Sequence, residues 1–371
     1  MEPASIECAR AFPARPTCWS RLPRAFLMRP FLAPRPDRPV DPADSAPMFS
    51  VIVAAYQVAD VVSDALESLR GQTAPPHEII LCDDGSTDAL EDALAPYREE
   101  IVFVRKTHGG EASAKNAAAA RATGDFVVIL DADDAFLPTR LEALGELAQL
   151  RPDLDILTTD AYLVVDGRRV KRNYGRRWRF EVADQRRAIL QRNFVFGHAA
   201  VRRQRMLEHK GFDESILWTT DWDLWLRMIL DGSRVGAVDE PLALYRLRQT
   251  SLTARRRELA LGKISTLDKA AQSNLLEPGE RAVVERTIMA HRREVDMIDV
   301  RAAAMAGNQS VRGRALAAAR GGGSSLRQRL EALAIAASPA LSRRVLRRRA
   351  ARSWVGAGGT RVAKSRGAID P

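Results

Sequence analysis

Three carboxylates follow one apolar segment of the chain. The run GDFVVIL leads directly into Asp131, Asp133 and Asp134. Carboxylates this close together repel one another, so the cluster indicates a bound positive charge. Hard divalent cations such as Mg²⁺ and Mn²⁺ are held by one or two carboxylates together with substrate phosphate oxygens. We expect a strand with Asp131 and Asp133 on one face and Asp134 turning into the loop. A solvated acidic loop is the alternative.

A second pair of acids ends another apolar run. Asp83 and Asp84 follow EIILC and precede a turn-forming Gly85. A carboxylate at the end of a parallel strand can accept a hydrogen bond from a nucleobase N–H or a ribose hydroxyl. An acidic turn that caps the next helix explains the same residues equally well.

A third acid stands at the start of an amphipathic segment, TTDWDLWLRM. A carboxylate such as Asp221 at a helix start in a cleft can act as general base toward a hydroxyl. A plain helix N-cap is the competing interpretation of Asp221. Trp222 and Trp225 are expected in the core or the cleft wall.

The elements that position these acids follow an alternating pattern. Short apolar runs alternate with segments of helical spacing, which predicts an α/β fold with a mostly parallel sheet flanked by helices. The predicted strands are SVIVAAY, EIILCDD, IVFVRKT and DFVVIL, followed by DILTTDAYLVV and a closing strand pair within RVGAVDEPLALYRLR. Ligands of such sheets bind at the carboxyl edge of the strands, where the acids lie.

The chain divides into three parts by composition. Residues 1–47 are rich in Pro and Arg without periodicity, which predicts a disordered head. An alternative is that translation begins at Met48, directly before the first strand. Residues 48–250 form the predicted α/β domain. Residues 251–371 predict a helical, basic C-terminal extension, interrupted by the linker-like GGGSS.

The positive charge is concentrated at the C-terminal end. The net charge is +10, and residues 311–371 alone contain fourteen Lys or Arg against two acids. A nucleic-acid enzyme would more often place its positive charge around the active cleft, so we expect no nucleic-acid partner. Three cysteines (Cys8, Cys18 and Cys82) form no disulfide or metal pattern, which suits the cytoplasm. No apolar run approaches the roughly 20 residues of a membrane span.

Together these motifs resemble the family 2 glycosyltransferases of GT-A fold. The resemblance covers about residues 48–250 and rests on the order of SVIVAAYQ, EIILCDDGSTD, the pair Lys115–Asn116, GDFVVILDADD and DWDLWLR. It implies an inverting transfer of a sugar from a nucleotide-diphosphate sugar to an acceptor hydroxyl. It also implies assistance by a divalent cation, Mn²⁺ or Mg²⁺.

The resemblance also implies roles for individual residues. Ala54 and Tyr56 would lie along the nucleobase, Asp84 would bond it, and Asp83 would support the same edge. Lys115 would approach the diphosphate or the base. Asp131 would contact ribose and metal, and Asp133 and Asp134 would bind the metal. Asp221 would be the catalytic base.

Two positions depart from the family pattern. Thr220 stands where an acid often precedes the base, and Arg248 stands near the place where a His is common. Arg248 could contact the diphosphate as a permanent cation, but it is no neutral metal ligand. The alternatives to a transferase are a sugar-nucleotide pyrophosphorylase, a receiver domain and a non-catalytic nucleotide-sugar-binding protein.

The C-terminal segment SPALSRRVLRRRAARSW predicts an amphipathic helix. Leu341, Val345 and Leu346 have helical spacing beside many Arg residues, and Trp354 is nearby. Such a helix can lie on an anionic membrane, which would suit a lipid-linked acceptor, or can pack on the catalytic domain. We therefore expect a cytoplasmic protein with peripheral contact at the inner face of the plasma membrane.

Overall fold

The computed structural model describes residues 46–358 except 176–178, 248–254, 309 and 322–325. The predicted disordered head therefore lies almost wholly outside the described residues. Nine strands form one sheet: β1 Phe49–Ala55, β2 Glu78–Asp83, β3 Ile101–Arg105, β4 Phe126–Asp131, β5 Ala135–Phe136, β6 Ile156–Val165, β7 Arg168–Arg172, β8 Ala200–Arg202 and β9 Val235–Arg246.

The sheet has a parallel half and a mixed half. Its order is β3-β2-β1-β4-β8-β6-β9-β5, and β7 pairs with β6. Strands β1 to β4 run parallel to one another, because the connections between them carry helices. The short β8 is antiparallel to both β4 and β6, and it joins the two halves. The predicted α/β fold is confirmed.

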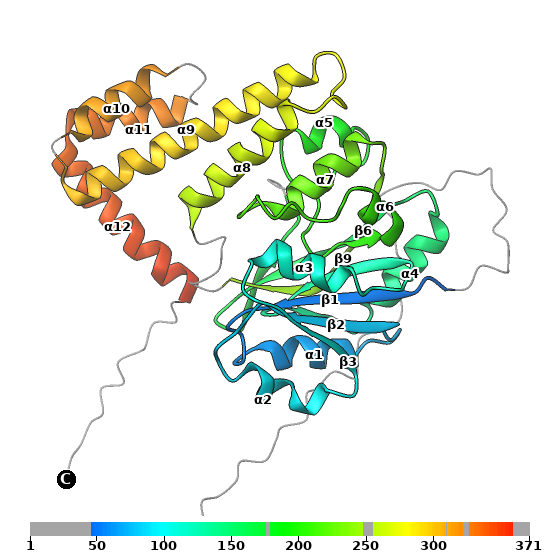
Figure 1. Ribbon diagram of the computed structural model, residues 1–371. Helices are drawn as coiled ribbons and strands as arrows, with labels where there is room; N and C mark the ends of the chain where they lie inside the picture. The colour runs from blue at the N-terminus through cyan, green and yellow to red at the C-terminus, as the bar shows by residue number, and fades with distance from the viewer. Residues whose placement is uncertain (1–45, 176–178, 248–254, 309, 322–325, 359–371) are drawn as a thin grey trace, which may run out of the picture.

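Helices cover both faces of the parallel half. The helices around the sheet are α1 Val62–Arg70, α2 Leu90–Leu94, α3 Glu111–Ala119, α4 Arg140–Leu150, α5 Gln185–Ile189, α6 Arg203–Glu208 and α7 Thr220–Leu230, with a 3-10 turn, η1, at Ala95–Tyr97. Helices α1 and α2 lie on one side of the sheet and α3 lies on the other (Figure 1). The strands read as continuous apolar runs because both faces are buried; β1 and β4 are buried along almost their whole length.

The register brings the predicted acids to one edge. In the sheet Ala55 is paired with Asp83, and Ala54 is paired with Asp131. The carboxyl ends of β2, β1 and β4 therefore meet side by side. This edge carries the candidate site.

Two local predictions are wrong. Strand β4 ends at Asp131, and the backbone N–H of Asp134 bonds the carbonyl of Asp131 at 3.0 Å, which closes a turn. Asp131 and Asp133 therefore do not share a strand face. The expected closing strand pair is one twelve-residue strand, β9, which follows β6 with shifts of register instead of folding back.

The C-terminal region is helical and contributes to two cores. Its helices are α8 Arg256–Ala271, α9 Glu280–Ala306, α10 Val311–Arg320, α11 Leu326–Ala337 and α12 Pro339–Gly358. Leu267 of α8 and Val284 of α9 belong to the main core. Farther along α9, Val300 and Ala304 join α10 and α11 in a separate small core. Figure 1 shows α9 reaching from the α/β part of the chain to this small bundle.

No described helix is both long and apolar enough to cross a membrane.

Candidate active site

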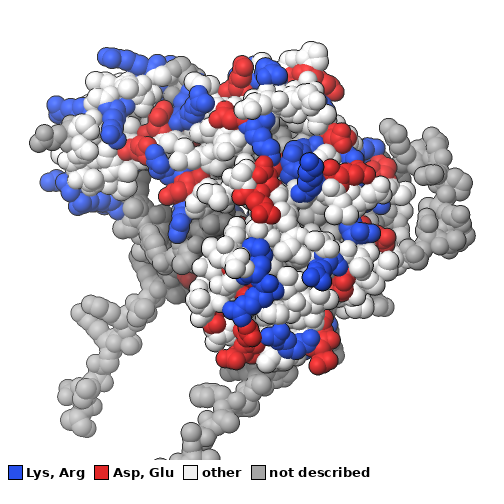
Figure 2. All heavy atoms as spheres, in the orientation of Figure 1, with Lys and Arg blue, Asp and Glu red and all other residues white. Residues whose placement is uncertain are grey.

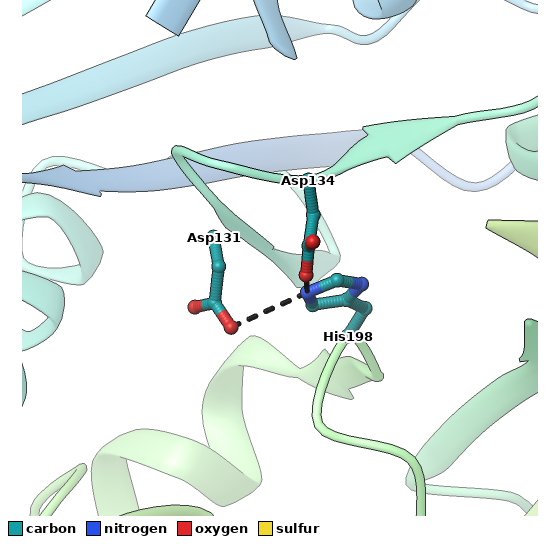
Figure 3. Close-up of side chains that lie close together, drawn as sticks. All are labelled: Asp131, Asp134 and His198. Atoms are coloured by element: carbon teal, nitrogen blue, oxygen red, sulfur yellow. Dashed lines mark hydrogen bonds and ion pairs between the residues drawn. The ribbon is translucent and has the colours of Figure 1, made fainter. Parts of the chain in front are cut away.

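Two carboxylates and one imidazole converge at the carboxyl edge of the sheet. Asp131, Asp134 and His198 each direct one ligand atom to a common point, and these atoms lie within 4.8 Å of one another (Figure 3). The Nε2 atom of His198 is 2.9 Å from Oδ2 of Asp134 and 3.3 Å from Oδ2 of Asp131. The sequence motif predicted two of these three residues.

Strand β9 holds the aspartate turn in place. The backbone N–H of Arg246 donates to Oδ1 of Asp134 at 2.6 Å. The Arg246 guanidinium donates to the carbonyl of Asp133 at 3.1 Å and pairs with Asp64 at 3.0 Å. Oδ2 of Asp134 is buried and faces the imidazole of His198 at 2.9 Å, which directs it at the common point. The Asp133 side chain does not join the three converging ligand atoms.

His198 is the main site residue that sequence reasoning missed. It lies in the irregular stretch between α5 and β8, where the only local signal is one His among apolar residues. The buried guanidinium of Arg140 donates to the carbonyl of His198, and the Phe196 ring lies 4.7 Å from the imidazole. The backbone of His198 is therefore held by a residue that is far away in the sequence, and its ring is held by the nearby Phe196.

The charges in this cluster are mutually dependent. Burial lowers the pKa of His198, but hydrogen bonds and attraction from Asp131 and Asp134 outweigh this and raise it to about 9. Burial raises the pKa of Asp131, but Lys115 and His198 outweigh it, so this pKa is well below its usual range. Burial and the neighbouring Asp134 and Asp131 raise the pKa of Asp133 to about 6. Neighbouring carboxylates that raise one another's pKa values are expected at a site that binds a cation.

Lys115 connects this cluster to helix α3. It lies on α3 with its side chain buried, and its Nζ is 2.8 Å from Oδ1 of Asp131 and 2.5 Å from Oε1 of Glu111. Burial lowers the pKa of Lys115, but the two carboxylates raise it by more, so the ammonium stays charged. Asp131 thus has a cation on one oxygen and an imidazole on the other.

Asp221 lies in the first turn of α7. The backbone N–H of Trp222 donates to its Oδ1 at 2.7 Å, and the side-chain amide of Asn193 donates to its Oδ2 at 2.9 Å. Thr219 is the N-cap residue of this helix, so the N-cap interpretation of Asp221 is wrong. The Trp222 indole donates to the carbonyl of Ile189 at 2.9 Å and anchors the helix on α5.

The electrostatic environment of Asp221 favours a proton acceptor. Burial raises the pKa of Asp221, and the hydrogen bond from the Trp222 N–H partly offsets the rise. Lys115 and Glu111 also act on this carboxyl, so the α3 ion pairs and the α7 carboxylate belong to one site. Gly197 lies beside Asp221, and an added Cβ there would be 3.5 Å from Oδ2. Because glycine has no side chain, this space beside the carboxylate stays open.

The second acidic pair holds a loop. Asp84 accepts hydrogen bonds from the backbone N–H groups of Gly109 and Gly110 at 2.9 and 2.7 Å and pairs with Lys106 at 2.9 Å. Asp83 accepts from the backbone N–H of Ser86 at 2.8 Å. Both acids are buried, so their visible task is to fix the turn after β2 and the loop before α3.

An aromatic surface borders this loop. The Tyr56 ring is exposed, follows β1 and stacks on the imidazole of His108 with ring centroids 4.2 Å apart. Ala54 lies one residue before the end of β1, in register with Asp131. A flat, accessible ring at the carboxyl edge has the shape that a nucleobase requires. Arg248 lies outside the described residues.

Comparison with known proteins identifies the family. The model of "Glycosyl transferase family 2" matches residues 50–210. "Putative glycosyltransferase EpsE" of Bacillus subtilis is 30% identical over 224 residues, which cover 58% of this chain and 77% of EpsE. This chain belongs to glycosyltransferase family 2. The predicted family and transferase class are confirmed, and the pyrophosphorylase and receiver-domain alternatives are set aside.

Solved glycosyltransferase structures have a fold similar to that of this chain, as the GT-A prediction requires. S. aureus TarS 1-349 in complex with UDP-GlcNAc matches with a TM-score of 0.52 at 18% identity, over 82% of this chain and 92% of TarS 1-349. The mannosyltransferase PcManGT from Pyrobaculum calidifontis, in complex with GDP-Man and Mn2+, matches with a TM-score of 0.54 at 20% identity, over 89% of this chain and 88% of PcManGT. At these identities the likeness shows the fold.

Proposed function

We propose that this family 2 glycosyltransferase is an inverting enzyme that moves a sugar from a nucleotide-diphosphate sugar to an acceptor hydroxyl. The observation that carries the proposal is the placement of Asp221. This carboxylate has a raised pKa and two fixed donors, and it shares its site with Lys115 and, through Lys115, with the Asp131–Asp134–His198 cluster. A proton acceptor and a cation site together are what a direct displacement requires.

The converging ligand atoms fit a divalent cation, Mn²⁺ or Mg²⁺. Two carboxylate oxygens suit both ions, and the imidazole favours Mn²⁺. The buried Oδ2 of Asp134 and the imidazole of His198 lie 2.9 Å apart, so two potential ligand atoms are already directed to one place, which supports this fit. We assign Asp131, Asp134 and His198 as the residues that would hold the ion, with Asp133 next to them. A bound cation would supply Lewis-acid stabilisation of the diphosphate leaving group.

The chemical step follows from the residues of the chain. The acceptor oxygen forms a bond to the anomeric carbon while the bond from that carbon to the diphosphate oxygen breaks. Asp221 takes the proton of the acceptor hydroxyl, and attack from the side opposite the leaving group inverts the anomeric configuration. General-base assistance contributes roughly 10²- to 10⁴-fold. We assign the attraction of the diphosphate to Lys115, with Arg248 as a second candidate for that contact.

The donor would lie along the carboxyl edge of β1, β2 and β4. Its base would rest near Ala54 and Tyr56, with Asp83 and Asp84 shaping the loop that borders it. Because Asp84 already accepts several hydrogen bonds, we assign it chiefly to the shape of the base pocket. The nucleotide sugars bound by TarS and PcManGT support this donor class.

The acceptor would be a hydroxyl of a glycan, lipid-linked glycan or other glycoconjugate of cell-envelope polysaccharide synthesis. The basic C-terminus would bring the enzyme to the inner face of the plasma membrane as a peripheral protein. Both points continue the expectations from the sequence.

A two-step experiment tests the proposed function. A panel of UDP- and GDP-sugars is first screened by thermal shift with and without Mn²⁺, and the stabilising donor is then assayed for metal-dependent hydrolysis and transfer. The Asp221→Asn enzyme should keep the thermal shift and lose transfer by roughly 10²-fold or more. Near-normal turnover by this variant would show that the base is another residue. Donor binding without hydrolysis or transfer by the native enzyme would favour a non-catalytic binding protein.

A further inference from the structure

Helix α11 exposes an apolar surface. Leu326, Leu330 and Leu333 are 73%, 58% and 47% exposed. Their spacing of four and three residues places them on one side of the helix. Ala332 and Ile335 lie on the other side and are buried. We call the three exposed leucines the α11 stripe.

Helix α12 begins two residues after α11 ends and continues this character. Leu341 and Val345 are exposed and one helical turn apart. Leu346 instead packs against the small core. Of the three apolar residues that predicted an amphipathic helix, two face solvent and one supports the bundle.

The bundle that carries these side chains is strongly cationic. Residues 307–348 contain nine Arg and one acid, Glu331. That acid is already engaged, since Arg301 of α9 pairs with it at 2.8 Å. By helical period Arg327 and Arg329 flank the α11 stripe on its two sides, and both are exposed. Figure 2 shows mainly blue and white atoms at this end of the molecule.

We propose that the α11 stripe, with Leu341 and Val345 of α12, docks on the surface of an anionic lipid bilayer. This inference rests on the membrane contact of the proposed function and moves its main apolar contact to α11. Leucines that enter the acyl boundary while flanking arginines meet anionic headgroups are the two components of interfacial helix binding. The arginine side chains are long enough to reach the headgroups while the leucines are buried.

Charge decides against a second copy of the chain as the occupant. An isologous contact through the stripe would bring two clusters of arginines together with no acid available between them. An anionic bilayer instead offers dense negative charge and an apolar layer beneath it. The lipid surface is therefore the partner that satisfies both features at once.

Vesicle flotation tests this surface. The native protein should float with vesicles of phosphatidylcholine containing phosphatidylglycerol and remain unbound with pure phosphatidylcholine. The triple variant Leu326→Ser, Leu330→Ser, Leu333→Ser should bind at least tenfold more weakly. The variant Arg327→Glu, Arg329→Glu should lose roughly fivefold or more per arginine, and added salt should weaken the native binding.

A matched control carries the same change elsewhere. Leu207 and Leu217 are also well exposed but lie in the catalytic domain, so Leu207→Ser, Leu217→Ser should leave flotation unchanged. The triple serine variant should also keep metal-dependent donor hydrolysis and its circular dichroism melting temperature. Failure of the membrane inference is thereby separated from failure of the glycosyltransfer proposal.

Two results would overturn the inference. Flotation of the triple serine variant equal to that of the native protein would place the contact in residues 338–371 alone. A native dimer in sedimentation velocity that the triple variant abolishes, with no vesicle binding by either protein, would identify a second copy as the occupant.

Discussion

The side-chain amide of Asn193 donates a hydrogen bond to Oδ2 of Asp221 at 2.9 Å. Oδ1 of the same carboxylate accepts from the backbone N–H of Trp222. Asp221 is thus held at both oxygens, from the α7 backbone and from the loop after α5. We infer that Asn193 is a positioning residue for the proposed base.

Replacement of Asn193 by Ala should move the acid limb of the pH–rate profile. The amide hydrogen bond lowers the pKa of Asp221, so its loss raises that pKa further. A base works only when deprotonated, so kcat would then rise at higher pH than in the native enzyme. At neutral pH kcat should fall about tenfold.

The control for this prediction is Gln204→Ala. The Gln204 amide donates to Glu208 on the exposed helix α6, away from the site. An Asn193→Ala profile that overlays the native one would show that the amide does not tune Asp221.

Replacement of His198 by Ala should weaken binding of Mn²⁺. The variant removes one of three converging ligand atoms, and we expect at least a tenfold loss of affinity in isothermal titration calorimetry. His209→Ala is the matched control, because His209 lies beside Asp231 and belongs to no ligand cluster of the described residues. Unchanged Mn²⁺ affinity in His198→Ala would remove the imidazole from the metal site.

Replacement of Gly85 by Ala should damage the loop that Asp84 holds. Gly85 has φ +77°, and a Cβ there would lie 2.9 Å from the backbone nitrogen of His108. We expect a loss of about 2 to 3 kcal/mol in the free energy of unfolding, together with weaker nucleotide binding.

Gly167 supplies the comparison for Gly85. It has φ +72° but no atom within 4 Å of an added Cβ, so Gly167→Ala should cost only about 1 kcal/mol and leave nucleotide binding intact. Urea unfolding and a nucleotide thermal shift measure both effects. Equal losses in the two variants would mean that the contact with His108 is unimportant.

Replacement of Lys269 by Met should loosen α8 from the catalytic domain. The Lys269 ammonium is 2.5 Å from Oδ2 of Asp213 and 2.8 Å from Oδ1 of Asp223. Lys269 and Asp213 are partly exposed, and the buried Asp223 keeps its pair with Arg227, so we expect a loss of about 1 kcal/mol at neutral pH. Lys171→Met on the exposed strand β7 is the control.

The stabilising effect of Lys269 should depend on pH in one direction. The hydrogen bond from Lys269 is the main reason that the pKa of Asp213 is lowered. A lowered carboxyl pKa contributes stability above the ordinary range near 3.9, and this contribution is lost as the pH falls below it. The difference between native and Lys269→Met proteins in urea unfolding should therefore shrink in acid. A difference that grows in acid would contradict this assignment.

Local patterns of the sequence were sufficient to predict the parallel half of the sheet. Strands β1, β2 and β4 are buried on both faces, so their apolar runs and the acids that end them are visible without tertiary information. Asp221 was also recognisable from a local pattern, because it lies at the start of a segment with helical spacing. His198 and Asn193 come from an irregular stretch whose conformation depends on distant partners such as Arg140.

The failure at Asp133 has a different physical cause. The prediction continued the strand to Asp133, whereas the strand ends at Asp131 and the chain turns there. Arg246, more than a hundred residues away in the sequence, holds this turn. The roles of the individual site residues remain predictions. The turn that carries Asp134 is held by Arg246 of β9, so the geometry of the acidic cluster depends on that strand.

Helix α9 belongs to both cores, with Val284 in one and Val300 in the other. At 1.5 Å per residue, its 27 residues make a rod of about 40 Å. Since the helix is continuous, its length sets the distance between the main core and the small core. Helix α8 lies along this rod, with Arg257 paired to Asp299 at 2.7 Å, so a longer or shorter α9 would change the reach of the enzyme above a surface only together with a matching change in α8.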